Sequence, residues 1–273
     1  MPELPEVETI CRSLNELLPG RRIAAVDVLE RRLRTNVDRG FEDRVRGREI
    51  LAVRRRGKYI CIALEGNLIW ICHLGMSGKL IHVQNEKPRE RHDHIMARLD
   101  DGHELRYHDP RRFGLVAVIH AEEAAAWPHF RGLGPDPLDA SFDGRYLHEQ
   151  ARRSRRRVRD LLLDQTVVAG LGNIYVNEIL FRCGIRPTAR AFKLRRERSE
   201  TIARVTREVL EQAIAMRGTS FSDYRDGRDR KGEFQNFLRV YDREGESCAI
   251  CRNPIKRVVL GNRSAFYCRA CQK

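Results

Sequence analysis

The sequence predicts an α+β protein: an N-terminal β-sandwich with a flanking helix, then a helical region, then a C-terminal zinc-binding β-hairpin. Short runs between residues 22 and 120 alternate apolar and polar side chains, which is typical of half-buried strands. Apolar residues between 146 and 217 instead recur at helical spacing, and two close cysteine pairs stand near the C-terminus. At 273 residues the chain can form two domains with separate cores.

The first predicted element is a helix that begins near Pro5. Proline suits the first turn of a helix, and the acidic Glu6 and Glu8 suit its positive end. Pro2 and Glu3 precede this helix and are not explained by it. The apolar residues that follow at helical spacing, before Pro19-Gly20, are Val7, Ile10, Leu14, Leu17 and Leu18.

Alternating runs follow the helix, and turn residues such as Asp101-Gly102 separate several of them. This pattern indicates a β-sandwich or a flattened barrel. The predicted strands are residues 22–29, 50–55, 59–64, 68–73, 94–99, 104–108 and 115–120.

After a stiff linker the period becomes helical, with helices expected over residues 146–163, 174–183 and 196–217. Gly184 and Gly218 stand where C-terminal caps are expected, and the polar residues 219–235 are predicted to form a loop. We therefore expect domains at residues 1–130, 146–235 and 236–273, with residues 131–145 as the linker.

Composition favours a nucleic-acid partner, because 52 Lys and Arg against 38 Asp and Glu give a formal charge of +14. No apolar run reaches membrane-spanning length and no signal-peptide pattern is present, which predicts a soluble, intracellular protein without a membrane partner. Cys11, Cys61, Cys72 and Cys183 lie among apolar neighbours and are expected to be buried free thiols.

The terminal cysteines Cys248, Cys251, Cys268 and Cys271 have the spacing C-x2-C-x16-C-x2-C. This spacing predicts a four-thiolate zinc site, which has no open coordination position and is therefore structural. The alternative is a pair of redox motifs. The metal would hold residues 256–260 and 263–267 as a hairpin too small to fold alone, with Arg263 near its tip.

Pro2 is the strongest candidate nucleophile. Removal of Met1 would leave a free secondary amine, which can add to a sugar C1′ and form an iminium. A terminal amine has an ordinary pKa near ~8, against ~10.4 for lysine, so much more of it is unprotonated at neutral pH. Glu3 stands beside it as a general acid or base. The alternative is a frayed terminus without a catalytic role.

The segment Met1–Glu8, the Gly170–Tyr175 segment and the four-cysteine hairpin occur together in this order. Their combination resembles the bacterial formamidopyrimidine-DNA glycosylase (8-oxoguanine-DNA glycosylase) family. The resemblance implies base-excision repair of oxidised purines in damaged double-stranded DNA, through a proline Schiff base followed by β,δ-elimination. It also implies that residues 146–235 form a helix–two-turn–helix DNA-binding domain, and that the protein is a cytoplasmic monomer with one structural Zn²⁺ and no organic cofactor.

The resemblance further assigns roles to individual residues. It makes Pro2 the nucleophile and Glu3 the acid/base, with Glu6 supporting the site. Lys58 would reach the damaged nucleotide and its phosphate, and Arg263 would take part in δ-elimination. The residues that the resemblance places on DNA are His73, Met76, His92, Arg111, Phe113 and Asn173, and Arg155 stands beside Ser154, where the family commonly has a DNA-contacting lysine.

Each role has an ordinary structural alternative. Lys58 could be a solvated surface lysine, Met76 and Phe113 could pack in the core, and Asn173 could be a helix N-cap. The arginine-rich run 152–159 would usually be a solvated face, which here could add non-specific DNA affinity. The resemblance implies that the predicted loop 219–235 closes over the flipped base. Its residues 225–231 are unusually charged for the family, whereas Thr219, Ser220, Asp223, Tyr224, Gly232, Phe234 and Gln235 fit it.

Two other functions remain open from sequence. An endonuclease VIII-like glycosylase for oxidised pyrimidines is the nearer alternative, although its N-terminus usually has glycine where this chain has Leu4. A non-catalytic zinc-ribbon DNA-binding protein is the other, and it would not require a free amine beside Glu3.

Overall fold

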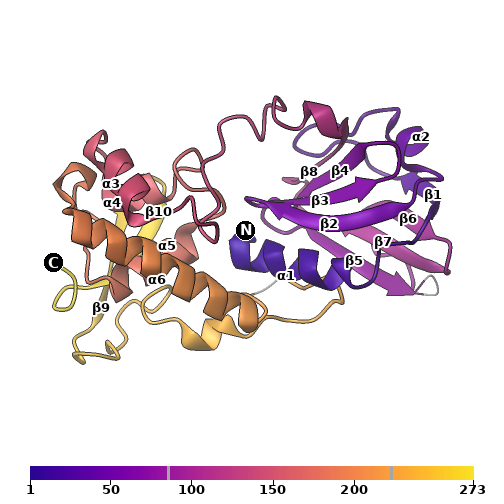
Figure 1. Cartoon of the computed structure of the whole chain (residues 1–273). Helices are drawn as coiled ribbons and strands as arrows, with labels where there is room; N and C mark the ends of the chain where they lie inside the picture. The colour runs from indigo at the N-terminus through magenta and orange to yellow at the C-terminus, as the bar shows by residue number, and fades with distance from the viewer. Residues whose placement is uncertain (85–86, 222–223) are drawn as a thin grey trace. The chain divides into compact units, whose positions relative to one another are not determined.

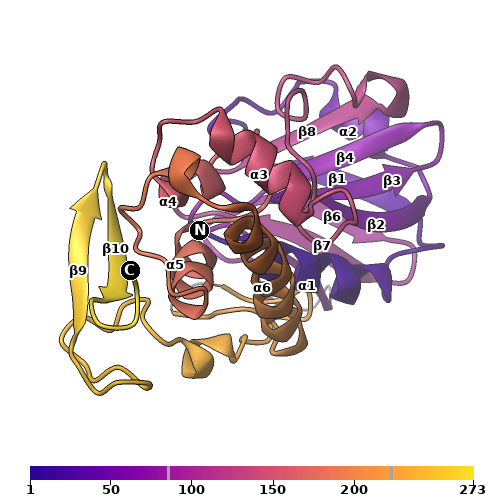
Figure 2. The ribbon, with the colours of Figure 1, turned by 60° about the vertical axis from the view of Figure 1, so that its left-hand side comes forward.

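The computed structural model describes residues 1–84, 87–221 and 224–273, and the chain divides into two compact units. Unit 1 comprises residues 1–131 and 214–235, and unit 2 comprises residues 132–213 and 236–273 (Figures 1 and 2). Among these residues, no helix combines the length and the apolar character that a membrane span requires.

Unit 1 is built on two antiparallel four-stranded sheets whose facing sides share one hydrophobic core (Figure 1). The predicted β-sandwich is therefore confirmed, and the edge-to-face pair of Phe41 and Trp70 lies in its core. The first sheet has the order β1 (Ile23–Val28), β6 (Asp93–Leu99), β7 (His103–His108) and β5 (Lys79–Gln84). The second has the order β2 (Ile50–Arg56), β3 (Tyr59–Leu64), β4 (Leu68–His73) and β8 (Leu115–His120).

Strand β5, a short helix and a short 3-10 turn of unit 1 were not predicted from the sequence. The sequence of strand β5 does not alternate regularly between apolar and polar residues, because Leu80 and Ile81 are consecutive and both buried. The short helix α2 (Phe41–Val45) buries only Phe41 and Val45, too few residues to show helical periodicity. A 3-10 turn, η1 (Ala121–Glu123), follows β8.

Helix α1 (Leu4–Asn15) packs along β2 of the same unit. Glu8 accepts a hydrogen bond from the Arg55 guanidinium at 2.8 Å, and Asn15 Oδ1 accepts the Val53 N–H at 2.7 Å. Both contacts cross from the helix to the strand. They hold the start of the chain against the strand that leads into Lys58.

Unit 2 is mostly helical and carries the C-terminal hairpin (Figure 2). Its hairpin strands pair Arg263 with Leu260 next to the turn. The elements from residue 144 onward are α3 (Gly144–Arg152), α4 (Val158–Leu162), α5 (Asn173–Arg182), η2 (Ala191–Lys193), α6 (Arg196–Ala215), η3 (Phe234–Phe237), β9 (Ile255–Leu260) and β10 (Arg263–Cys268). Two of these elements are shared between the units, since the last residues of α6 and the first residues of η3 belong to unit 1.

The single helix predicted over residues 146–163 is wrong, since the structure has two helices separated by residues 153–157. Ser154 Oγ accepts both the backbone N–H and the Nε–H of Arg156 at 3.3 Å, so a local side-chain bond competes with the helix. The neighbouring arginines also carry like charges at helical spacing, which disfavours a continuous helix.

Residues 214–235 belong to unit 1, whereas the sequence placed them with the second domain. The reason is a set of hydrogen bonds to α1. The Gly227 N–H donates to Ser13 Oγ at 3.0 Å, and the Tyr224 hydroxyl donates to the Glu6 carbonyl at 3.3 Å. Such long-range bonds leave no signal in the local sequence.

Candidate functional site

The first residues of unit 1 are held in a closed hydrogen-bonded arrangement. Glu3 is the N-cap of α1, and its backbone N–H donates to Glu6 Oε2 at 2.8 Å. The other carboxylate oxygen, Glu6 Oε1, accepts the N–H of Thr219 at 2.7 Å. Glu3 and Glu6 are only 3% and 1% exposed. One carboxylate therefore fixes both the helix start and the segment that follows α6.

Pro2 is buried, whereas Met1 ahead of it is 47% exposed. The proline nitrogen is in a peptide bond while Met1 is attached, so it becomes an amine only when Met1 is removed. The exposed Met1 would be accessible for that removal, and Glu3 is the residue covalently next to the amine that results.

Lys58 lies in the turn between β2 and β3 and is 7% exposed, so it is not a solvated surface lysine. Burial, and next the positive charge of Lys58, lower the pKa of His73 to about 4. His73 is therefore neutral at physiological pH. Its Nδ1 accepts the Gly75 N–H at 3.1 Å, which leaves Nε2 to carry the proton and donate it to an acceptor.

Two loops of unit 1 come together around Asp109, which is fully buried. Its carboxylate accepts hydrogen bonds from the Ser77 hydroxyl at 2.9 Å and from the Gly114 N–H at 2.8 Å. Gly75 allows this close approach, since a Cβ there would lie 2.5 Å from the Phe113 carbonyl carbon. Asp109 thus joins residues 75–77 to residues 111–114.

Met76, Arg111 and Phe113, which the resemblance places on DNA, lie on these two loops. Met76 and Phe113 are each 46% exposed, so neither packs in the core. The Arg111 guanidinium lies 4.7 Å from the Phe113 ring centroid, within the range of a cation–π contact. The loop between them turns at Arg112, which has a φ of 55° and whose N–H donates to the Asp109 carbonyl.

His92 precedes β6 and is half-buried. Its carbonyl accepts the Asp109 N–H at 3.1 Å, which places it beside the same loop as Arg111. Within unit 1 the structure therefore brings His73, Met76, His92, Arg111 and Phe113 onto connected segments.

The charged segment 225–231 is also ordered by contacts within unit 1. Asp226 is fully buried and accepts the backbone N–H groups of Arg228 and Arg230, each at 2.9 Å. Arg228 pairs with Glu16 at 2.7 Å. The loop charges are thus partly neutralised within the protein, while Asp223 lies outside the described residues.

In unit 2, Asn173 is the first residue of α5, and Gly172, not Asn173, is the N-cap. The Asn173 side chain does not cap the helix, because its polar atoms form hydrogen bonds with other residues. Its Oδ1 accepts from Arg159 Nη2 at 2.8 Å, and its Nδ2 donates to the Ser264 carbonyl at 3.0 Å. These bonds connect the start of α5 to the hairpin strand that carries Arg263.

Arg159 was expected on a solvated face, and the structure shows instead that it is 1% exposed. Its guanidinium reaches the Asp160 carboxylate at 3.3 Å and, at up to 3.5 Å, the carbonyls of Leu260, Arg263 and Ser264. Burial lowers the pKa of Arg159, and the nearby Asp160 charge opposes that shift.

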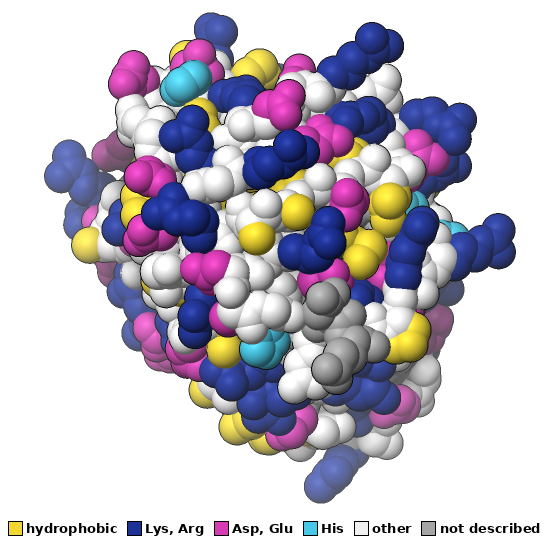
Figure 3. Space-filling model, turned by 90° about the vertical axis from the view of Figure 1, so that its right-hand side faces the viewer, with side chains coloured by type: hydrophobic (Ala, Val, Ile, Leu, Met, Phe, Trp, Pro, Cys, Tyr) yellow, Lys and Arg dark blue, Asp and Glu magenta, His cyan; other side chains and the backbone are white. Residues whose placement is uncertain are grey.

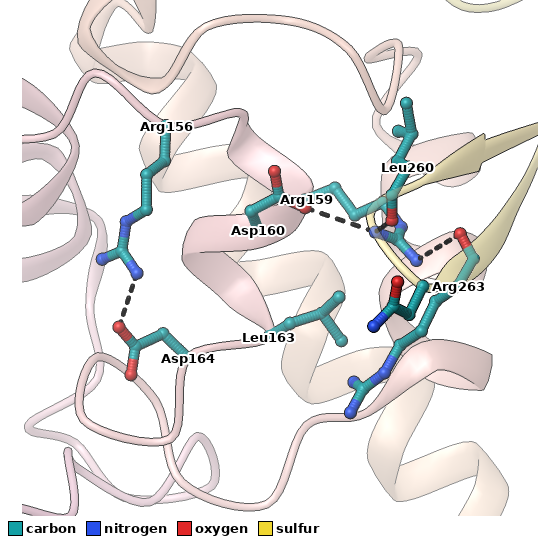
Figure 4. A pocket seen from close by; sticks show the side chains of 8 residues that line it. Arg156, Arg159, Asp160, Leu163, Asp164, Leu260 and Arg263 are labelled. Carbon is teal, nitrogen blue, oxygen red and sulfur yellow. Dashed lines mark hydrogen bonds and ion pairs between the residues drawn. The ribbon is translucent and has the colours of Figure 1, made fainter.

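Arg159 and Arg263 line a pocket of about 350 Å³ within unit 2 (Figure 4). Figure 4 shows Arg156 paired with Asp164 on one side, at 2.6 Å, and Arg263 on the other. Arg155 is exposed in the turn between α3 and α4. The remaining lining residues are Asp160, Leu163, Leu260 and Asn262.

Further buried polar residues of α5 were missed from the sequence. The Glu178 carboxylate is fully buried and accepts the backbone N–H groups of Arg239, Val240 and Tyr241, each at 2.9 Å. Asn177 Oδ1 accepts the Phe266 N–H at 2.7 Å. The only available signal was two adjacent polar residues inside an apolar helix.

The four terminal cysteines are positioned to bind one zinc ion, since their Sγ atoms all lie within 4.8 Å of one another. The Sγ atoms of Cys251 and Cys268 are 3.3 Å apart, and those of Cys248 and Cys271 are 3.9 Å apart. Tetrahedral zinc with bonds of about 2.3 Å requires separations of roughly 3.8 Å. The donor set fits the metal and leaves no position for a substrate.

The remaining thiols are free, as expected. Cys11, Cys72 and Cys183 are buried, and Cys61 is half-buried. Burial raises the pKa of Cys61 and of Cys183 to about 12, so both stay protonated and unreactive at neutral pH.

The basic side chains are dispersed on the face that Figure 3 shows, where Lys and Arg alternate with Asp and Glu. Several arginines form ion pairs, including Arg12 with Glu8 and Arg22 with Glu65. On this face, charge alone therefore does not locate a nucleic-acid interface.

Comparison with known proteins matches three consecutive parts of the chain. The formamidopyrimidine-DNA glycosylase N-terminal domain matches residues 1–116, the H2TH domain of the same proteins matches residues 133–225, and a zinc finger found in FPG and IleRS matches residues 245–273. The chain is 44% identical over 273 residues to formamidopyrimidine-DNA glycosylase of Thiobacillus denitrificans, covering all of both chains. It belongs to the formamidopyrimidine-DNA glycosylase family.

Other members of this family give the same picture. The enzyme of Desulforamulus reducens is 42% identical over 275 residues, covering 100% of this chain and 99% of its own. Lactococcus lactis Fpg in complex with DNA containing an abasic site has a TM-score of 0.93 and 32% identity, with 99% of each chain covered. The same protein with DNA containing Fapy-dG has a TM-score of 0.91, covering 99% of this chain and all of that one.

Proposed function

We propose that this protein is a base-excision-repair DNA glycosylase and AP lyase that removes oxidised purines from damaged double-stranded DNA. The observation that carries the proposal is the N-terminal arrangement, in which Glu6 fixes Glu3 at the helix start directly after Pro2. Family membership supports the substrate class, and it favours oxidised purines over the pyrimidines of an endonuclease VIII-like enzyme. We further propose that it acts as a cytoplasmic monomer.

The proposed reaction begins when the Pro2 lone pair attacks C1′ of the lesion and the bond from C1′ to the base breaks. The departing base takes the bonding electrons and a proton. Glu3 protonates the sugar ring oxygen as the ring opens, which leaves an iminium between Pro2 and C1′. The iminium acidifies the C2′ protons, and loss of one of them expels the 3′ phosphate by β-elimination. A δ-elimination with Arg263 taking part then releases the 5′ phosphate.

Lys58 and His73 are proposed to bind the phosphate next to the lesion. Lys58 contributes a positive charge, whereas His73 is neutral and contributes a hydrogen-bond donor at Nε2. His92, Asn173 and Arg155 are proposed as further backbone contacts. Such contacts position the duplex and make its binding salt-dependent.

Met76, Arg111 and Phe113 are proposed to fill the gap that the flipped nucleotide leaves. Two exposed apolar side chains can replace lost stacking, and a guanidinium can donate to the acceptors of the orphaned cytosine. The exposure of Met76 and Phe113 supports this assignment, since neither side chain has a packing role to explain it.

Trapping with borohydride tests the proposal, because reduction of an iminium leaves a permanent protein–DNA adduct. A duplex with 8-oxoguanine opposite cytosine should give a covalent adduct with protein that has lost Met1. Pro2→Gly, or an uncleaved N-terminal tag, should greatly reduce the adduct. A thymine-glycol duplex serves as the comparison for the pyrimidine alternative.

Absence of any adduct would instead support a protein that binds DNA without chemistry. A full yield from tagged protein would refute the role of Pro2. Preferential trapping on thymine glycol would refute the oxidised-purine assignment while leaving the Schiff-base chemistry intact.

A further inference from the structure

A second group of metal-ligating side chains lies in unit 1, and it includes none of the terminal cysteines and none of the residues given a role above. His82 on β5 and His103 on β7 share one face of the sheet, because His103 pairs with Gln84 two residues along from His82. Their rings stack with centroids 4.6 Å apart and an angle of 18° between planes. Asp101, in the turn before β7, places Oδ1 3.3 Å from His103 Nδ1.

Two imidazole nitrogens of this group are buried without hydrogen-bond partners among the described residues. They are Nε2 of His82 and Nδ1 of His103. A buried polar atom left without a partner destabilises the folded state, so such atoms are uncommon unless something else satisfies them. The carboxylate 3.3 Å away does not meet the geometry of a hydrogen bond to His103 Nδ1.

We propose that His82, Asp101 and His103 bind one divalent transition-metal ion, for which Zn²⁺ is the best match. Two imidazoles and one carboxylate are a donor set that suits Zn²⁺, Ni²⁺ and Cu²⁺ far better than Mg²⁺ or Ca²⁺. One donor atom from each of the three residues already lies within 4.8 Å of the other two. The fourth position of a tetrahedral ion would be taken by water.

Only a small movement is needed to close this site around an ion. Zinc bonds of about 2.0–2.1 Å bring tetrahedral donors to roughly 3.3 Å apart, so donors that lie at most 4.8 Å apart need to move inward by no more than about 1 Å. The scaffold is fixed, because strands β5 and β7 pair in register and the His82 N–H donates to the Gly227 carbonyl at 2.9 Å. Rotation of the rings about their side-chain bonds can supply the movement.

Nearby charges set the expected strength of binding. Arg21 pairs with Asp101 Oδ2 at 3.0 Å, which leaves Oδ1 as the carboxylate donor. Arg228 is held by Glu16 at 2.7 Å and adds a second positive charge in the neighbourhood. These cations repel a divalent ion, so we expect this site to bind Zn²⁺ much more weakly than the four-cysteine site does. The ion would join β5 to the turn between β6 and β7.

Native mass spectrometry of the full-length protein, with zinc already in the cysteine site, tests this proposal. With about 100 μM added Zn²⁺, the wild-type chain should carry two zinc ions, which implies a dissociation constant in the micromolar range. H82Q and H103Q should each carry one, because loss of one of three ligands should weaken binding of the second ion about a hundredfold or more, which brings its dissociation constant to the added zinc concentration or above it. H120Q, which removes an exposed histidine from β8, should still carry two.

A second readout uses the wild-type protein alone, in case a variant fails to fold. Addition of Zn²⁺ should shift the imidazole NMR signals of His82 and His103 and leave that of His120 in place. A wild-type chain that carries one zinc ion, unshifted signals for this pair, or two ions retained by folded H82Q and H103Q would each overturn the proposal.

Discussion

The Glu6 carboxylate accepts the Thr219 N–H at 2.7 Å, although the two residues are 213 positions apart in the chain. Its second oxygen accepts the Glu3 N–H at 2.8 Å, so one buried side chain satisfies two backbone donors. Because Glu3 follows Pro2 directly, this carboxylate determines where the proposed nucleophile is held. The contact therefore couples the folding of unit 1 to its chemistry.

Replacing Glu6 by Gln should destabilise the protein and slow excision. An amide offers one acceptor oxygen where the carboxylate offers two, so one buried N–H loses its partner, at a cost of about 1–3 kcal/mol. Urea unfolding would measure the loss, and single-turnover excision of 8-oxoguanine would measure the rate. Glu16→Gln is the control, because Glu16 is 67% exposed. Equal stability of both variants would contradict the buried role of Glu6.

Gly218→Ala should disturb the same contact by a different route. Gly218 has a φ of +76°, and a Cβ there would lie 2.8 Å from Glu6 Oε1. Gly20→Ala is a matched control, since its φ is +83° and a Cβ there would meet nothing within 4 Å. Gly20→Ala should lower the free energy of unfolding only through backbone strain, by about 1 kcal/mol. We expect Gly218→Ala to lose clearly more stability than Gly20→Ala, and urea unfolding would compare them.

Arg159→Met should weaken DNA binding without removing zinc. The substitution removes the hydrogen bonds that the guanidinium donates to Asn173 Oδ1 and to the hairpin carbonyls, so the start of α5 and the hairpin strand that carries Arg263 are no longer joined through it. We expect DNA affinity to fall about tenfold or more, measured by fluorescence anisotropy at fixed salt. Arg159→Lys should recover little, because an ammonium cannot reproduce the planar fork.

The control for Arg159 is Arg145→Gln, which changes a largely exposed arginine of α3 by the same unit of charge. Its DNA affinity should change little. If both variants weakened binding equally, Arg159 would act only through its charge, and the buried network would have no positioning role.

The site residues that could be predicted from sequence are those with local signatures. Pro2 and Glu3 stand outside a recognisable helix start, and the cysteine spacing alone specifies a zinc hairpin. Asp109, Arg159 and Glu178 could not be predicted, because each is buried by partners from distant segments. Nothing next to Asp109 in the sequence distinguishes it from an ordinary turn aspartate before proline.

The fold shows the same division between local and long-range information. Strands with regular alternation were predicted nearly to their ends, whereas β5 was missed because Leu80 and Ile81 are both buried. Residues 214–235 were assigned by proximity in sequence to α6, yet hydrogen bonds to Glu6 and Ser13 place them in unit 1.

The low pKa of His73, about 4, predicts a loss of stability as the solution is acidified. Unfolding returns His73 to an ordinary pKa near ~6.5, so the unfolded state binds the extra proton between pH 6.5 and 4. The contribution of neutral His73 to the free energy of unfolding is therefore complete above pH 6.5 and declines below it. Between pH 7.5 and 5 we expect a loss of roughly 2 kcal/mol.

His73→Gln removes this titration, so its stability should fall by about 2 kcal/mol less than that of the wild type over the same interval. Urea unfolding at pH 7.5 and 5.0 measures both. Parallel pH dependence of the two proteins would show that His73 is not held neutral by its surroundings.

Removal of zinc should abolish DNA binding while unit 1 stays folded. The hairpin core is small and includes Cys248 and Cys268 themselves, so it should lose its structure without the metal. Arg263 lies on that hairpin and would then lose its fixed position. Both tryptophans, Trp70 and Trp127, belong to unit 1, so their fluorescence should report an unchanged fold. Treatment with a strong chelator, followed by DNA-binding and fluorescence measurements, checks both expectations.

Added zinc should restore binding to the chelated protein, because the four thiolates recreate a complete tetrahedral donor set. Cys268→Ser should lose zinc and DNA affinity together, whereas Cys61→Ser, at a half-buried thiol of β3, should keep both. If zinc-free protein bound DNA at full strength, the hairpin could not be part of the DNA-binding surface, and the proposed role of Arg263 would fail with it.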